Sequence, residues 1–237
     1  MEKHIALPRS SSTGWVGRLR ALVLAGAFSL ASLPTFAGYV TTNETAMDAI
    51  FAQTSFGANP IDIRYNAVVT LNLPSLLDIG SESEFESLNS LVTVSPKTAL
   101  AFFVDSISWC GGSGGSIIGC GESPGDVFAV SSSWAAHATY GAPLIAHELS
   151  HNLGLGHVAD ENNLMNPTLY GNTALTGGQV TTLLASALVQ TDVGGQKYIS
   201  ITPVAVVPEP AAVLMLVAGL MTVAGQAARR GRRTKGG

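Results

Sequence analysis

The sequence predicts an α+β domain in which a β-sheet packs against a helix that carries several histidines. Three observations point to this fold class. Residues 98–105 form an almost continuous apolar run, as a strand in the centre of a sheet does. Residues 61–66 alternate apolar and polar side chains, which is typical of a half-buried strand. Residues 142–153 read as a helix, with Pro143 in its first turn and Leu144, Ile145 and Leu149 near the core.

The other elements follow from local patterns along the chain. Residues 41–57 are expected to form a helix, with Thr42 or Asn43 as its N-cap. Residues 175–180 lead into a further helix over 181–188. Additional strands are expected at 68–73 and 125–131, the second of them directly before the histidine-bearing helix.

The N-terminal segment has the organisation of an export signal. A basic leader precedes an apolar run at 19–31, which is short for a membrane span, and Thr35 and Ala37 provide small residues at a cleavage site. We therefore expect residues 1–37 to be a signal peptide that signal peptidase removes after Ala37. The alternative is an N-terminal membrane anchor.

The C-terminal segment, residues 208–237, has a different three-part order. The motif Pro208-Glu209-Pro210 precedes a mostly apolar run at 211–228, and a cluster of arginines follows. This resembles the P-E-P sorting tail of Gram-negative bacteria. The resemblance implies a transient hold in the inner membrane through 211–228, processing by an exosortase-type enzyme and delivery to the cell surface or outside. A permanent anchor is the alternative.

Between the two ends, residues 38–207 form one expected domain with 14 acidic and three basic residues, a formal charge of −11. Such a domain repels phosphate groups, so nucleic acid is excluded as a partner. Its two cysteines, Cys110 and Cys120, flank a glycine-rich segment, 111–115, which we expect to be a loop. In an exported protein this pair predicts a disulfide. A metal-binding pair is the alternative.

The motif that organises the chain is His147-Glu148-x-x-His151-x-x-Gly154-x-x-His157. On a helix, positions i and i+4 share a face, so His147 and His151 can bind one metal ion. Gly154 lets the chain leave the helix and bring His157 to the same point. Three protein ligands leave one position open, as in catalytic zinc sites, and Glu148 is placed to act as a general base.

This extended motif resembles the metzincin clan of zinc endopeptidases. Met165, in Leu164-Met165-Asn166-Pro167, is the candidate for the methionine turn of that clan, and its spacing from His157 is most similar to matrixins. Asn166 departs from the tyrosine that matrixins usually have there. The resemblance implies a metzincin-like catalytic domain: a twisted mixed sheet, an active-site helix, an edge strand that pairs with substrate, and a C-terminal helix below the zinc.

The function expected from these features is that of a secreted zinc endopeptidase with one catalytic Zn²⁺ and a protein or peptide substrate. Zinc activates a water molecule, and Glu148 takes its proton and delivers it to the leaving amine. Cleavage of cell-wall peptides is a variant of this hypothesis. The alternative is a non-catalytic, zinc-containing protein of the cell surface or matrix.

Three weaker candidates remain. His137 could touch substrate or a second metal, although an isolated histidine is usually structural. Tyr170 could donate to an oxyanion. The cluster Glu82, Glu84 and Glu86 could bind Ca²⁺, which nothing else in the sequence supports, or form a solvated acidic helix or loop.

Overall fold

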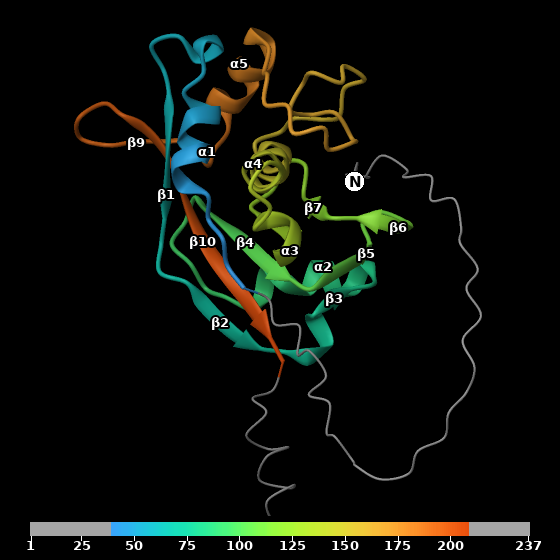
Figure 1. Ribbon diagram of the computed structural model, residues 1–237. Coiled ribbons are helices and arrows are strands. Elements are labelled where there is room, and N and C mark those ends of the chain that lie inside the picture. The colour runs from blue at the N-terminus through green and yellow to red at the C-terminus, as the bar shows by residue number, and fades with distance from the viewer. Residues whose placement is uncertain (1–38, 209–237) are drawn as a thin grey trace, which may run out of the picture.

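A seven-stranded sheet runs through residues 39–208, the part of the chain that the computed structural model describes (Figure 1). Four parallel strands are followed by one antiparallel strand at the edge. In spatial order these are β1 (Ile61–Tyr65), β10 (Lys197–Val207), β4 (Thr98–Val104), β8 (Val127–Ser131) and β7 (Gly119–Gly121). The predicted α+β class with a twisted mixed sheet is confirmed, and β4 is central, as expected.

β10 was not predicted, although it is the longest strand and joins the sheet together. It pairs with β1, β4, β2 (Val69–Asn72) and β9 (Gln190–Thr191). Its side chains alternate between two cores, with Ile199 and Ile201 on one face and Val204 and Val206 on the other, all four at 0% exposure. The C-terminal helix of the prediction is therefore not the last element of the described chain.

Pro203 makes β10 unusual, because proline has no N–H to donate and seldom occurs inside a sheet. The carbonyl of Ile201 accepts from Asn66 N on the β1 side, so the backbone of residue 203, two positions on, faces the same side. On that side β1 pairs only as far as residue 201, and β2 begins at 204. The missing donor thus falls in the gap between two neighbouring strands.

One face of the sheet, which we call the helical face, is covered by helices (Figure 1). The helix that carries the histidines, α4, packs on β7 and β8 and contacts α1. Leu144, Ile145 and Leu149 are fully buried in this core, as predicted. The helices are α1 (Glu44–Phe51), η1 (Thr54–Phe56), α3 (Ser132–Ala135), α4 (Gly141–Asn152) and α5 (Gly177–Ala185).

The opposite face, which we call the hairpin face, packs against a second, three-stranded sheet. A disulfide joins Cys110, which directly follows β5, to Cys120 in β7, and this confirms the predicted pairing. The glycine-rich segment is not the loop that was expected, because most of it is strand β6, paired with β5. The elements here are η2 (Pro74–Leu76), β3 (Asp78–Ile79), α2 (Glu82–Ser87), η3 (Leu88–Ser90), β5 (Ser106–Trp109) and β6 (Ser113–Ile117).

Two helices differ from the prediction at their ends. α1 is shorter than 41–57, and its N-cap residue Asn43 has a left-handed backbone, φ 52°, without a side-chain cap. The Asn43 amide instead donates to the carbonyl of Ala135, tying α1 to α3. α5 begins earlier than expected because Thr176 and Gln179 form a capping box at its start.

The predictions on the chain ends fall outside the described residues. The signal peptide 1–37, the run 211–228, Glu209 and Pro210 are not described, and Pro208 is the last residue that is. Among residues 39–208 no helix has both the length and the apolar character that crossing a membrane requires.

Candidate metal centre

Helix α4 presents two histidines one turn apart. His147 and His151 are both buried, at 0% and 1% exposure. The helix ends after Asn152, and Gly154, with φ +100°, turns the chain out of the helical path. The turn returns the chain toward α4 and brings His157 beside the other two rings, as the motif predicted.

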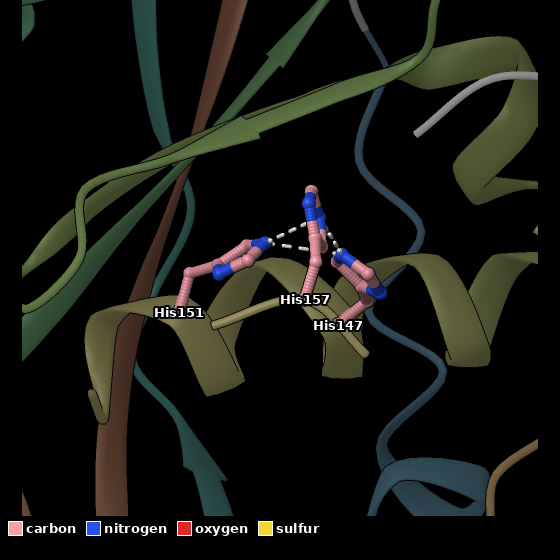
Figure 2. A group of neighbouring side chains, drawn as sticks. All are labelled: His147, His151 and His157. Atoms are coloured by element: carbon pink, nitrogen blue, oxygen red, sulfur yellow. Dashed lines mark hydrogen bonds between the residues drawn. The ribbon is translucent and has the colours of Figure 1, made fainter. Parts of the chain in front are cut away.

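The three imidazole rings converge on one point (Figure 2). The Nε2 atom of His151 lies 3.1 Å from that of His147 and 3.1 Å from that of His157, and the remaining pair is 3.2 Å apart. In a tetrahedron with zinc–nitrogen bonds of about 2.0–2.1 Å, the ligand nitrogens are about 3.3–3.4 Å apart. The triangle of nitrogens is therefore close to the size that a zinc ion needs.

Hydrogen bonds on the far side of two rings determine which nitrogen carries the proton. His147 Nδ1 lies 2.7 Å from the carbonyl oxygen of Leu164, and His151 Nδ1 lies 2.7 Å from that of Leu155. A carbonyl oxygen only accepts, so each Nδ1 must be the N–H donor. In the neutral rings, both Nε2 atoms then direct lone pairs at the shared point, where a bound cation would stabilise them.

The electrostatics of the site favour this neutral state of His147. Burial lowers the pKa of His147 well below its ordinary value, and the neighbouring His151 and His157 lower it further, against the opposing effect of the bond to Leu164. Neutral imidazole is the form that binds a metal. Burial also raises the pKa of the Glu148 carboxyl well above its ordinary value.

The side chain of Glu148 projects from α4 toward the edge strand β7. It is 2% exposed, and two glycines of β7 face it. A Cβ atom at Gly121 would stand 2.9 Å from the Glu148 backbone oxygen and 3.3 Å from His151 Cβ, and one at Gly119 would collide with the Glu148 carboxylate. Glu148 and His151 therefore share the side of α4 that faces β7, and glycine provides the room.

Met165 is fully buried in the core of the helical face. Its carbonyl accepts from Val158 N, next to His157. Asn166, the residue that departs from the matrixin pattern, accepts from Thr168 N and closes a turn around Pro167. The segment is thus held beside two members of the histidine group.

Neither His137 nor the three glutamates belong to this histidine group. His137 is exposed, packs between Trp134 and Tyr140 with ring centroids 6.0 and 4.7 Å away, and accepts from Thr139 N. Tyr170 is 42% exposed. The three glutamates lie on the predicted acidic helix, α2, where Glu84 accepts from Gly80 N.

Sequence reasoning missed Asn163 and Gln179, whose side chains bond to each other near Met165. A signal for Gln179 is present in the sequence, because Thr176-Gly177-Gly178-Gln179 has the spacing of a capping box. No local pattern indicates Asn163.

Comparison of the chain with protein-family models, with proteins of curated function and with solved structures found no match. The arrangement of His147, His151, His157 and Glu148 therefore carries the functional argument by itself.

Proposed function

We propose that this protein is an exported zinc endopeptidase in which His147, His151 and His157 hold one zinc ion and Glu148 is the general base. The observation that carries the proposal is the convergence of three Nε2 atoms, two of them in rings whose protons are fixed on Nδ1 by backbone carbonyls. Three histidine ligands suit a catalytic site with an open position better than a structural site, which usually has four protein ligands.

Zinc, when bound, supplies Lewis acidity that polarises a peptide carbonyl and acidifies water. Glu148 is adjacent to the ligand His147 and shares the β7 side of α4 with His151. From there it accepts the proton of the attacking water and delivers it to the nitrogen of the leaving amine. Met165 supports the ligands by packing, without contributing a metal bond.

The substrate is proposed to lie along β7. In the described sheet β7 pairs with β8 on one side and forms the edge on the other. An extended peptide can add to such an edge through backbone hydrogen bonds, which would bring its carbonyl past Glu148. The disulfide Cys110–Cys120 is consistent with an extracellular location, where protein disulfides persist.

The decisive experiment measures zinc per chain and cleavage of an unfolded protein substrate by the oxidised protein. Glu148→Ala should keep one zinc per chain and lose cleavage by roughly 10²–10⁴-fold, the usual contribution of a general base. Glu161→Ala, which removes an exposed glutamate from the loop after His157, is the matched control and should change neither.

Cleavage that resists both a chelator and Glu148→Ala would refute the proposal. One zinc per chain without cleavage of any protein or wall peptide would favour the non-catalytic surface protein instead.

A further inference from the structure

A pair of side-chain amides lies behind the metal centre. Asn163 Nδ2 donates to Gln179 Oε1 at 2.8 Å, and Gln179 Nε2 donates to Asn163 Oδ1 at 3.0 Å. Asn163 is 5% exposed, so its amide depends on protein partners. The pair joins the loop after His157 to the first turn of α5.

The orientation of both amides is fixed by backbone donors. Met165 N donates to Asn163 Oδ1 at 2.9 Å, and Thr176 N donates to Gln179 Oε1 at 2.9 Å. A backbone N–H requires an acceptor, so each receiving atom must be the amide oxygen. Turning either amide over would set donors against donors at two contacts.

The contact with Met165 leads directly to a histidine of the metal centre. The N–H of Met165 and the carbonyl of Leu164 belong to one planar peptide group. Its N–H is held by Asn163 Oδ1, and its carbonyl accepts from His147 Nδ1 at 2.7 Å. Any rotation of this plane that breaks the first bond also moves the acceptor that orients His147.

His151 provides an internal comparison. Its Nδ1 partner is the carbonyl of Leu155, four residues away in the turn that ends α4. The acceptor for His147 is seventeen residues away, on a separate loop. The ring of His151 is therefore oriented by its own turn, whereas that of His147 depends on how the loop is held.

We infer that Asn163, supported by Gln179, is a positioning residue for His147 and acts through the Leu164–Met165 peptide. The inference rests on the proposed metal site and extends it to two residues outside the histidine motif. Outer partners of metal-binding histidines typically change metal affinity by about 10–100-fold when they are replaced.

The test compares zinc dissociation constants, measured by competition with a chelator, for the full-length protein and three variants. Asn163→Ala should raise the zinc Kd by about 10–100-fold. Asn163→Asp keeps an oxygen acceptor for Met165 N but sets its second oxygen against Gln179 Oε1, so it should recover part of the loss. Asn172→Ala is the matched control: Asn172 lies in the same loop and donates to the Glu161 carbonyl at 2.7 Å, so its removal should leave Kd unchanged.

The cobalt(II)-substituted proteins provide a second readout, since d–d absorption bands report ligand geometry. These bands should shift in Asn163→Ala and stay as in the wild type in Asn172→Ala. If Asn163→Ala does not fold, Gln179→Ala takes its place, with a rise in Kd of a few-fold because the Asn163–Met165 bond remains.

Equal Kd values in Asn163→Ala, Asn172→Ala and the wild type would overturn the inference. Asn163 would then only stabilise its loop. A wild-type protein that binds no zinc would overturn both the inference and the proposed function. A wild-type protein that binds zinc without cleaving peptides would overturn the function alone, and the Kd comparison would still decide the role of Asn163.

Discussion

The two faces of the main sheet are built from the same strands but differ in what they support. The helical face buries α1, α4 and α5 and carries the histidine group. The hairpin face packs against the second sheet and α2. The disulfide links Cys110, which follows β5 of the second sheet, to Cys120 in β7 of the main sheet. Burial alone therefore does not make a core residue important for the geometry of the histidine group. The residue must also pack on the face that positions α4.

The largest difference between the two faces is expected for two neighbouring residues of β4. Phe102 and Phe103 are both 0% exposed, but Phe102 belongs to the core of the hairpin face and Phe103 to that of the helical face. Phe102→Ala and Phe103→Ala should each lower the free energy of unfolding by about 3–5 kcal/mol, because each leaves a cavity. Only Phe103→Ala should also raise the zinc Kd, since the core under α4 is then loosened.

Denaturant unfolding and chelator competition measure the two effects in the same samples. If the alanine variants are too unstable to purify, Phe102→Leu and Phe103→Leu take their place. Both should lose less unfolding free energy, and again only the variant at position 103 should raise the zinc Kd. A rise in Kd of equal size in both variants would contradict the separation of the faces.

The two faces also meet within β7, where Gly119 faces α4 and the neighbouring Cys120 forms the disulfide on the hairpin face. A methyl group at Gly119 would meet the Glu148 side chain from its carboxylate as far as Cγ, so this buried side chain has to leave its present place for the methyl group to fit. Gly119→Ala should therefore lower kcat by about 10–100-fold, the effect of a misplaced catalytic group, with zinc content nearly unchanged.

Gly177→Ala is the control, because nothing lies within 4 Å of its added carbon. An unchanged kcat in Gly119→Ala, or a loss of kcat that follows a loss of zinc, would show that Glu148 is not displaced.

The smallest effect is expected at the rim, outside both cores. Asp192 Oδ2 lies 2.8 Å from Arg64 Nη2, and this bond lowers the pKa of Asp192 below its ordinary 3.8. A carboxyl with a lowered pKa stabilises the fold above its unfolded pKa, and this contribution disappears as the pH falls through the folded value. Asp192→Asn should thus be slightly less stable than the wild type at pH 7, and the difference should disappear only as the pH falls below 3.8 and through the lowered pKa of the folded state.

Thermal unfolding of both proteins without metal, from neutral to acidic pH, checks the sign. A gap that widens in acid would mean that Asp192 acts through something other than Arg64.

The histidine group was predictable because its geometry is local. His147 and His151 are related by one helical turn, and Gly154 marks where the chain leaves α4. The same is true of β4, whose apolar run is long enough to indicate burial on both faces.

β10 and Asn163 were not predictable because their partners are remote. β10 contains Pro203, and a proline in a sequence normally argues against a central strand. The structure resolves this, because Pro203 faces the gap between β1 and β2, where no hydrogen bond is needed. The sequence around Asn163 is that of an ordinary loop. The inferred role of Asn163 depends on Gln179, which lies in the capping box of α5. Side-chain amides do not reveal their partners through spacing.

The position of β10 also governs when this protein can fold. β1 and β4 have no pairing with each other in the described sheet and meet only through β10, the last element of the described chain. A chain that is still being synthesised or translocated therefore carries its histidine helix before the strand that closes the sheet beneath it. Long-range parallel pairing forms slowly, so the histidine group should assemble only after residues 197–207 have emerged. If the protein is the exported peptidase proposed above, this order would delay its activity until residues 197–207 have crossed the membrane.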